Sequence, residues 1–462
     1  MDILLTHGYF LAEDSIELKI MRPYPPLGIL YISSYLKSKN FDVEIFDSTF
    51  ATKAEFFKQI KSDKPKIVGI YCNLMTKLNV LPMIKFLKEQ KVTVILGGPE
   101  PAQYAKNYLD YGADFVVSGE GEQTLEELIP ILQNKDFEKF PQVKGITFKD
   151  ENGSFCQNEP RGQLPDLDLL PLPDRESIDI QKYVRTWREN HGFGAVSLIT
   201  ARGCPFHCKW CSHEVYGRTH RRRSPENVIE EIEKINSLYS PDFLWYADDV
   251  FTINRKWLFE FEEKMKEANL KFPFECISRA DRMNEEIVSS LANLGCQKVW
   301  IGSESGSQKI LDAMARGVKV EQVQEATLLA QEKGMQTGMF LMWGYEGEEI
   351  EDIEATIEHV KETNPDTFLT TVSYPIKGTT YFKEIEDKVF SEKNWAERTD
   401  RDLDVERRFS KEFYKFVDRR LNGEVTLHRL KKDNSKDYFQ IAKAFVNSQV
   451  GKLGMNFHKI KN

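Results

Sequence analysis

The 462-residue sequence lacks the features of several common functional classes. No stretch approaches the ~20 consecutive apolar residues that a membrane-spanning helix needs, so we expect no membrane span. Met1–Leu5 leads directly into polar residues, which predicts no signal peptide. With a net charge of -9, no domain is strongly basic, which argues against nucleic acid as a partner. The composition, 41% hydrophobic and 29% charged, is typical of a globular protein, and we expect a cytoplasmic location.

Cysteine is scarce, and its spacing is uneven. Of the seven cysteines, Cys204, Cys208 and Cys211 form a C-x3-C-x2-C run. The others are scattered and do not suggest a disulfide framework: Cys72, Cys156, Cys276 and Cys296. Structural zinc usually needs a second pair of ligands, and the chain has no second C-x2-C pair. Three thiolates on one loop suit a [4Fe–4S] cluster with one open iron. Zinc with His207 or His213 as the fourth ligand is the alternative.

The residues around the cysteines favour a tight, shielded loop. The loop follows the apolar run Val196–Thr200, which we expect to be a strand. Gly203 and Pro205 allow a sharp turn, and Trp210 could shield a cluster from water. A loop at the carboxyl end of a strand lies at the edge where α/β sheets and barrels bind ligands.

Residues 1–134 alternate short apolar runs with amphipathic stretches. We expect strands at residues 2–6, 42–47, 67–71, 93–96 and 115–118, with helices at 27–38, 54–62, 78–90, 102–108 and 124–132. This order predicts an α/β domain with a doubly wound parallel sheet, in the manner of a Rossmann fold. Its ligand should lie at the carboxyl edge of the strands. The loops at that edge contain Asn73, Leu74, Met75, Thr76, Gly97, Gly98, Pro99, Glu100, Gly119, Glu120 and Gly121.

The rest of the chain divides into three parts. Residues 135–185 read as a linker with a small hairpin near 145–155. Residues 186–386 contain six strand candidates, each separated from the next by a helix, which predicts a partial (β/α)6 TIM-like barrel. Polar residues follow several of these strands: Asp248, Asp249, Ser278, Arg279, Ser303 and Glu304. The tail, residues 387–462, has helical spacing at 394–420 and 438–450 and predicts a helical region.

The cysteine run resembles the signature of radical S-adenosylmethionine (SAM) enzymes, which also have an aromatic residue before the last cysteine. Three features of the first domain look like the cobalamin (B12)-binding domain that precedes many such enzymes. They are Pro-Pro-Leu-Gly-Ile-Leu-Tyr at 25–31, the Gly-Gly-Pro-Glu-Pro loop and Gly-Glu-Gly-Glu. The resemblance covers residues 1 to about 385. It implies a [4Fe–4S] cluster, SAM and cobalamin as cofactors.

The resemblance also implies roles for residues of the second domain. SAM carries an ammonium and a carboxylate, which require a carboxylate and a cationic or hydroxyl partner. Glu304 and Arg279 match the SAM-contacting positions of the family, and Arg316 falls where a basic residue approaches the SAM carboxylate. Ser303, Ser278 and Asp248 suit the remaining polar contacts, and Trp210 lies on the cluster side. Each of these residues also has a structural alternative, such as Asp248 capping a helix or Arg279 forming an ion pair.

Two departures bear on the site, one from the wider cobalamin-binding fold and one from the radical SAM pattern. The D-x-H-x-x-G motif that supplies a histidine to cobalt is absent, and His7 is the only histidine of the first domain. We therefore expect cobalamin without a protein histidine on cobalt, its lower face covered by the loop 72–76. In the second domain, Tyr345 and Glu346 stand where the family usually has proline.

The implied function is methylation of an unactivated carbon. A 5′-deoxyadenosyl radical removes a hydrogen atom, and methylcobalamin donates the methyl group. Three alternatives stay open: a cyclase, oxidoreductase or rearrangement reaction on a small metabolite; a radical enzyme whose first domain no longer binds cobalamin; and a zinc protein without catalysis. The expected partners are a small-molecule substrate and an external one-electron reductant of the flavodoxin or ferredoxin type.

Overall fold

The computed structural model describes residues 1–213 and 215–459. It divides into two compact units, which we describe separately. The first unit comprises Met1–Pro205, Ser212–Ala247 and Glu392–Arg401. The second unit comprises Phe206–Cys211, Asp248–Ser391 and Asp402–Asn462.

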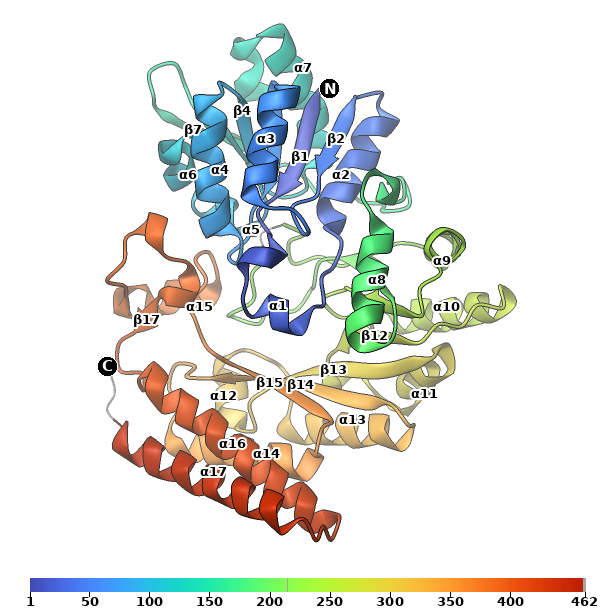
Figure 1. Cartoon of the computed structure of the whole chain (residues 1–462), viewed down its shortest axis with the longest axis vertical. Coiled ribbons are helices and arrows are strands. Elements are labelled where there is room, and N and C mark those ends of the chain that lie inside the picture. Colours follow the sequence, from blue (N-terminus) through green and yellow to red (C-terminus); the bar gives the residue numbers. More distant parts are fainter. Residues whose placement is uncertain (214, 460–462) are drawn as a thin grey trace. The chain divides into compact units, whose positions relative to one another are not determined.

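The first unit is built on a seven-stranded sheet (Figure 1). In spatial order the strands are β2 (Val43–Phe46), β1 (Ile3–His7), β3 (Ile67–Tyr71), β4 (Thr93–Gly97), β5 (Phe115–Val117), β6 (Ile146–Lys149) and β7 (Phe155–Gln157). Neighbours from β2 to β5 are parallel, and the hairpin β6–β7 adds two antiparallel strands at one edge. The predicted doubly wound sheet is confirmed. The chain reverses direction across the sheet between β1 and β3, which is where such folds bind ligands.

Alternating strand residues build a separate core on each face of this sheet. Leu4 packs with residues of α3 and α4, whereas Ile3 and Leu5 pack with residues of α2 and α7. Successive side chains of a strand point to opposite faces, so an apolar run fills both cores. The helices of the unit are α1 (Glu17–Ile20), α2 (Leu27–Ser38), α3 (Lys53–Asp63), α4 (Lys77–Glu89), α5 (Pro99–Gln103), α6 (Ala105–Tyr111), α7 (Glu122–Asn134), α8 (Ile180–His191) and α9 (Pro225–Tyr239).

The six predicted β/α repeats of the following domain are also confirmed in chain order. In the first unit, β8 (Ala195–Leu198) pairs in parallel with β11 (Phe243–Tyr246). In the second unit, the parallel strands are β12 (Phe274–Ser278), β13 (Cys296–Glu304), β14 (Gln336–Trp343) and β15 (Thr367–Val372). The intervening and flanking helices are α10 (Arg255–Glu267), α11 (Glu285–Leu294), α12 (Gln308–Ala313), α13 (Val320–Glu332), α14 (Ile350–Thr363) and α15 (Thr380–Ile385).

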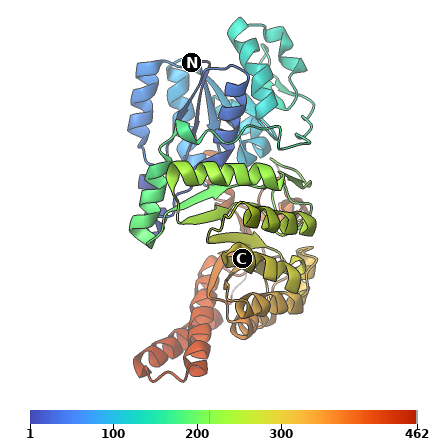
Figure 2. The ribbon, with the colours of Figure 1, turned by 90° about the vertical axis from the view of Figure 1, so that its right-hand side faces the viewer.

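The tail forms a pair of long helices, α16 (Lys411–Lys432) and α17 (Tyr438–Phe457), which lie side by side in Figures 1 and 2. The helix predicted from residue 394 is wrong in its first half. There the chain forms a short turn and the small strand β17 (Asp404–Val405), which pairs with β16 (Val389–Phe390). One reason is that Trp395 packs against Tyr108 in the first unit, with ring centroids 4.8 Å apart.

Helix α16 starts where its first backbone N–H groups, which have no acceptor within the helix, find a hydrogen-bond partner. The Ser410 hydroxyl accepts a hydrogen bond from the Phe413 N–H, which caps α16. The last residues of the predicted tail, 460–462, lie outside the described residues. Across residues 1–213 and 215–459, no helix combines the length and apolarity needed to cross a bilayer.

Candidate cofactor site

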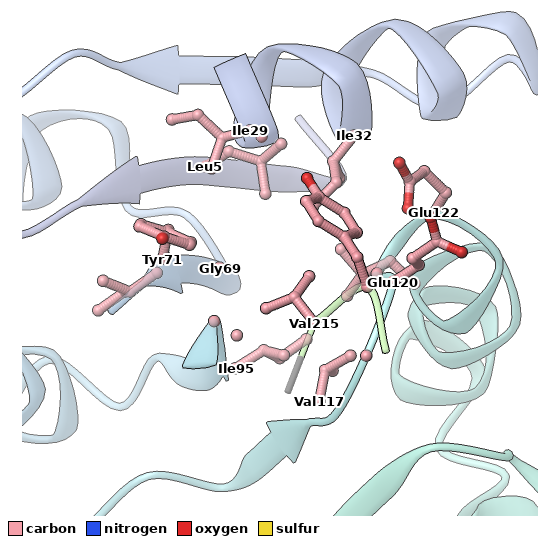
Figure 3. Close-up of a pocket in the computed structure, with 18 of the residues that line it drawn as sticks. Leu5, Ile29, Ile32, Gly69, Tyr71, Ile95, Val117, Glu120, Glu122 and Val215 are labelled. Atoms are coloured by element: carbon pink, nitrogen blue, oxygen red, sulfur yellow. The ribbon is translucent and has the colours of Figure 1, made fainter. Parts of the chain in front are cut away.

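A pocket of about 690 Å³, partly open to solvent, lies at the carboxyl edge of the first unit's sheet (Figure 3). Its lining comes from β1, β3, β4 and β5, from the starts of α2 and α7, and from the segment around Val215. Tyr71 lies at one end of the pocket and Glu120 and Glu122 at the other. The lining residues are Leu5, Gly28, Ile29, Ile32, Gly69, Ile70, Tyr71, Ile95, Gly97, Gly98, Val117, Gly119, Glu120, Gly121, Glu122, Leu125, Arg202, Val215 and Tyr216.

Glycine keeps the backbone close at two points of this lining. A Cβ on Gly69, within β3, would lie 2.8 Å from the side chain of Leu5. Gly98 has a φ of +108° and would place a Cβ 2.3 Å from the carbonyl oxygen of Cys72. A side chain at either position would force its neighbours apart, so the shape of the pocket depends on these glycines.

The charged groups of the pocket neutralise one another. Arg202 donates hydrogen bonds of 2.7 Å to both Glu120 and Glu122, and Arg221 donates one of 2.8 Å to Glu120. Burial raises the pKa of Glu120, but the bonds from Arg221 and Arg202 outweigh it and hold the pKa below its usual value. The Arg202 guanidinium also lies near the ring of Tyr216, 5.3 Å from its centroid. The lining of the pocket is therefore mainly apolar, and the two carboxylates at this end are paired with arginine.

Both ends of the cysteine loop belong to the wall of this pocket. Arg202 lies two residues before Cys204, and Val215 and Tyr216 follow Cys211. The base of the loop is closed by two short antiparallel strands, β9 (Ala201–Arg202) and β10 (Arg221–Arg222). Sequence reasoning did not identify these pocket residues. The only signal was the position of Arg202 within the cysteine motif, because a charged residue in a buried strand needs a partner.

The structure divides the residues predicted for the cobalamin side into two groups. Gly97, Gly98, Gly119, Glu120 and Gly121 line the pocket. The others do not line it: Asn73, Leu74, Met75, Thr76, Pro99 and Glu100.

The loop 72–76 is fixed by its own hydrogen bonds. The Asn73 side chain accepts the N–H groups of Met75 and Thr76 at 3.0 and 3.1 Å, and the Thr76 hydroxyl accepts the Asn73 N–H at 3.0 Å. Met75 is exposed at the tip of this loop. The loop is joined to the pocket by the Cys72 N–H, which donates to the carbonyl of Gly97 at 2.8 Å.

Glu100 points into the protein. Its carboxylate accepts a hydrogen bond from the Tyr108 hydroxyl and lies 3.6 Å from the buried ammonium of Lys77. Burial raises the pKa of Glu100 to about 7, against the opposing effect of these two partners. Lys77 in turn lies over the ring of Trp395, 4.0 Å from its centroid. The Glu100 side chain is thus part of the packing that holds residues 392–401 against the rest of the first unit.

His7 has no ring nitrogen to spare for a metal. Its Nδ1 accepts the N–H of Tyr9 at 3.2 Å, and its Nε2 lies 3.1 Å from the Asp47 carboxylate. Tyr183 donates a second hydrogen bond to Asp47, at 2.7 Å. The only histidine of residues 1–134 is therefore engaged on both sides, in accord with the missing histidine motif.

In the second unit, two guanidinium groups approach the buried thiol of Cys208. The nearest nitrogens of Arg279 and Arg316 lie 3.6 and 3.8 Å from its sulfur. Arg279 also lies over the ring of Phe206, 3.6 Å from the centroid, and donates to the backbone carbonyl of Arg316 at 2.8 Å. Arg279 is additionally held by Asp281 at 2.9 Å, so its predicted ion pair exists.

Glu304 is the most strained of the predicted SAM residues. It lies at the end of β13 with a φ of +62°, directly after an irregularity in the pairing with β14. Non-glycine residues adopt this conformation rarely, and away from helix ends it marks backbone strain. Among the residues that the structure describes, no group donates a hydrogen bond to its carboxylate. Burial raises the pKa of Glu304 to about 7, although Arg316 and Arg279 oppose the shift.

The neighbouring Arg316 is also incompletely paired. It donates to the Gly302 carbonyl at 2.8 Å, but its buried Nε has no partner within the described chain. A Cβ on Gly302 would lie 2.6 Å from the guanidinium, so a side chain there would displace Arg316 from this position. The pair Glu304 and Arg316 offers one anionic and one cationic group to a zwitterion.

The remaining predicted residues are buried and polar. Ser303 lies 3.0 Å from Nε2 of His359, and Ser278 lies 2.5 Å from the Thr252 hydroxyl. Asp248 is buried after β11. His359 was not anticipated from the sequence, because a single histidine on an amphipathic helix gives no signal; burial lowers its pKa to about 4.

The segment 206–211 is anchored in the second unit by its backbone and by Trp210. The Lys209 N–H donates to the Met314 carbonyl at 3.0 Å, and the Lys209 carbonyl accepts the Tyr381 N–H at 2.9 Å. Trp210 packs in a cluster with Met314, Tyr345 and Tyr381. The aromatic residue before the last cysteine thus holds the loop in place.

The donor chemistry of the loop fits an iron–sulfur cluster. Three thiols lie in one short run, and the buried Cys208 is flanked by cations. In residues 1–213 and 215–459, no group of three or more His, Cys, Asp or Glu side chains lies close enough to hold one metal ion. The assignment of the three thiols as ligands therefore rests on their spacing and chemistry.

Comparison with known proteins assigns the same two parts of the chain. Residues 198–360 match the family model of the radical SAM superfamily, and residues 18–129 match that of the B12 binding domain. An uncharacterized methyltransferase of Pyrococcus horikoshii is 30% identical over 84% of this chain and 84% of its own length. The anaerobic magnesium-protoporphyrin IX monomethyl ester cyclase of Rubrivivax gelatinosus is 27% identical over 84% of this chain and 71% of its own.

A solved structure has the same fold over most of the chain. The radical S-adenosylmethionine methyltransferase TsrM from Kitasatospora setae, with cobalamin and a [4Fe–4S] cluster bound, has a TM-score of 0.70. The match covers 85% of this chain and 77% of that one, at 16% sequence identity. At this identity the likeness shows the fold.

The fold and the site define an α/β enzyme that joins a cysteine-loop barrel to a B12-type pocket. The chain belongs to the radical SAM superfamily and carries a B12 binding domain ahead of its radical SAM domain. The family predicted from the sequence is confirmed, and so are its cofactors: a [4Fe–4S] cluster, SAM and cobalamin.

Proposed function

We propose that this protein is a cobalamin-dependent radical SAM methyltransferase that methylates an unactivated carbon of a small-molecule substrate. One observation carries the proposal: both ends of the cysteine loop line the B12-type pocket. The segment of chain that carries the three cysteines also supplies Arg202, Val215 and Tyr216 to the lining of the pocket, which favours an enzyme that uses both cofactors. The relative from Pyrococcus horikoshii, itself named a methyltransferase, supports the same reaction class.

The side chains of the second unit would bind and orient SAM. The Glu304 carboxylate would accept the SAM ammonium, because it is buried and receives no hydrogen bond from the described residues. Arg316, with its unpartnered Nε, and Arg279 would face the SAM carboxylate. Ser303, Ser278 and Asp248 would serve the ribose and adenine. The thiols of Cys204, Cys208 and Cys211 would hold the cluster.

The first unit would hold cobalamin in the pocket between Tyr71 and Glu120. Gly97, Gly98 and Gly119 let the backbone approach a bulky ligand there, and His7 is engaged elsewhere. When bound, cluster and SAM supply a 5′-deoxyadenosyl radical that removes a hydrogen atom, and cobalamin supplies the methyl group. Methyl transfer of this kind needs no general base, and none is assigned.

We also infer that an external one-electron reductant of the flavodoxin or ferredoxin type reduces the cluster, and that the protein works in the cytoplasm. The cysteines outside the cluster loop, Cys72, Cys156, Cys276 and Cys296, form no disulfide bonds, which suits a reducing compartment.

The test uses protein purified without oxygen from cells supplied with cobalamin. We expect about four irons and one cobalt per chain. With SAM labelled with deuterium on its methyl group and a chemical reductant, S-adenosylhomocysteine should form in proportion to the bound cobalt. 5′-Deoxyadenosine without S-adenosylhomocysteine would contradict methyl transfer and favour a cyclase-type or other radical reaction. Iron without cobalt would exclude the two-cofactor mechanism and leave a radical SAM enzyme.

A further inference from the structure

The last described helix, α17, presents large apolar side chains to solvent. Phe439 is 78% exposed, Leu453 67% and Phe457 86%. Tyr438, Phe445 and Val446 are also exposed on this helix. Phe439, Val446 and Leu453 are seven residues apart, and Phe457 follows Leu453 by four, so these four lie along one side of the helix. We call this set the α17 apolar face.

The opposite side of α17 is buried by small residues. Ala444, Ser448 and Gly451 pack against α16. A Cβ on Gly451 would lie 2.6 Å from the backbone nitrogen of Arg420, so the two helices approach closely. A surface helix normally buries its large apolar residues and exposes polar ones. Here the close contact uses the small residues, and the large ones are exposed.

The charged residues of α17 itself are all lysines. Residues 438–459 contain Lys443, Lys452 and Lys459 and no acidic residue, in a chain of net charge -9. Lys443 is four residues from Phe439 and three from Val446, so it lies along one border of the face. Lys452 follows Phe445 by seven and lies along the other border. Neither lysine forms an ion pair with a described carboxylate.

We propose that α17 binds the surface of a membrane that contains anionic lipids. Helices that lie in the membrane interface combine exposed aromatic and aliphatic residues with flanking lysines, whose ammonium groups reach the lipid phosphates. Anionic headgroups supply the negative charge that the helix lacks. Pairing with a second copy through the same face would instead crowd lysines of like charge around the contact. The inference is independent of the reaction that the enzyme catalyses.

The experiment measures cosedimentation of the full-length holoprotein with vesicles. Vesicles of phosphatidylcholine alone are compared with vesicles that contain about one third phosphatidylglycerol. We expect binding to the anionic vesicles that weakens in high salt, because screening removes the headgroup attraction. Substituting Phe439→Ser, Leu453→Ser and Phe457→Ser together should lower the partition coefficient by at least about tenfold.

Two controls distinguish lipid binding from misfolding and from self-association. Leu169→Ser and Leu328→Ser, at exposed positions elsewhere, should leave binding unchanged, and iron content and circular dichroism should be equal in all variants. No cosedimentation with anionic vesicles would overturn the proposal. A concentration-dependent dimer that the triple substitution abolishes would also overturn it, in favour of a second copy as the partner.

Discussion

Two buried carboxylates, one in each unit, have opposite surroundings. Glu120 lies between Arg202 and Arg221, and their guanidinium groups outweigh its burial and lower its pKa. Glu304 lies near Arg316 and Arg279 but receives no hydrogen bond from the described residues, and burial raises its pKa to about 7. A pocket whose charges are already paired suits a large, mostly uncharged body. A site with incompletely paired charges suits a small zwitterion that completes them.

The same contrast extends to the backbone. In the first unit, glycines at Gly69 and Gly98 keep side chains out of the pocket. In the second unit, the strain lies in the backbone of Glu304, a proposed SAM contact, which adopts a positive φ. The first site therefore provides space for a ligand. The second provides buried polar groups whose hydrogen bonding is incomplete.

The largest effect is expected from the cluster loop. Cys208→Ala should abolish iron binding and all SAM cleavage, since a cluster that has lost one of three thiolates loses its anchor. Iron analysis and the visible absorption spectrum measure this. Cys156→Ala, a half-buried thiol on β7, is the matched control and should retain full iron content. Equal iron in both variants would show that Cys208 is not a ligand.

The second prediction tests the unpaired carboxylate. Glu304→Gln should weaken SAM binding by about 100-fold, because a charge-assisted bond to the ammonium is worth ~1.5–3 kcal/mol. Equilibrium dialysis with SAM on the iron-loaded protein measures the affinity. Cobalamin content should be unchanged. Affinity of the wild type should also fall as pH drops below about 7, where the carboxyl becomes protonated.

The third prediction compares how Glu304 and Glu120 affect the free energy of unfolding. Because the pKa of Glu304 is raised on folding, the folded state holds its proton more tightly, and this residue costs stability as pH rises from about 4.3 to about 7. Glu304→Gln should therefore stabilise the apoprotein, by roughly 2–3 kcal/mol more at pH 8 than at pH 5.

For Glu120, stability changes with pH in the opposite direction. Its lowered pKa contributes stability above the unfolded value, and that contribution is lost as pH falls through the folded pKa. At pH 8, Glu120→Gln should destabilise the protein by roughly 3 kcal/mol, since it leaves buried guanidinium groups underpaired. Denaturant unfolding of both variants at the two pH values measures the difference. If both substitutions changed the free energy of unfolding in the same direction, the contrast between the two sites would be wrong.

The smallest effect is expected from filling the pocket. A Cβ on Gly28 meets no atom within 4 Å, so Gly28→Leu should fold and extend into the space at the start of α2. We expect cobalamin affinity to fall about tenfold, with SAM affinity unchanged, because only displaced contact area is lost. Gly162→Leu, at an equally open position outside the pocket, is the control. Cobalamin retention after gel filtration measures the result, and equal retention in both variants would place the ligand elsewhere.

Sequence periodicity was sufficient for the architecture, and the cysteine spacing for the family. Alternating runs of β-branched residues and amphipathic helices depend on neighbours along the chain, which a sequence displays directly. The helices of the tail were predicted less accurately. Residues 394–410 have helical spacing, yet Trp395 finds a better environment over Lys77 and against Tyr108, far away in sequence. Such a contact has no local signal.

The sequence by itself determined the sheet, the repeats and the cysteine loop, because each depends on local pattern or spacing, and the resemblance to a family implied the cofactors. Only the tertiary structure decided which polar residues are paired. Glu100 and Glu120 both follow a strand of one sheet, but Glu100 turns inward to Lys77 and Tyr108, whereas Glu120 meets Arg202 at the pocket. The partners of a buried charge come from distant parts of the chain. Burial and pairing, which set a pKa and decide what a site can bind, are therefore properties of the folded molecule.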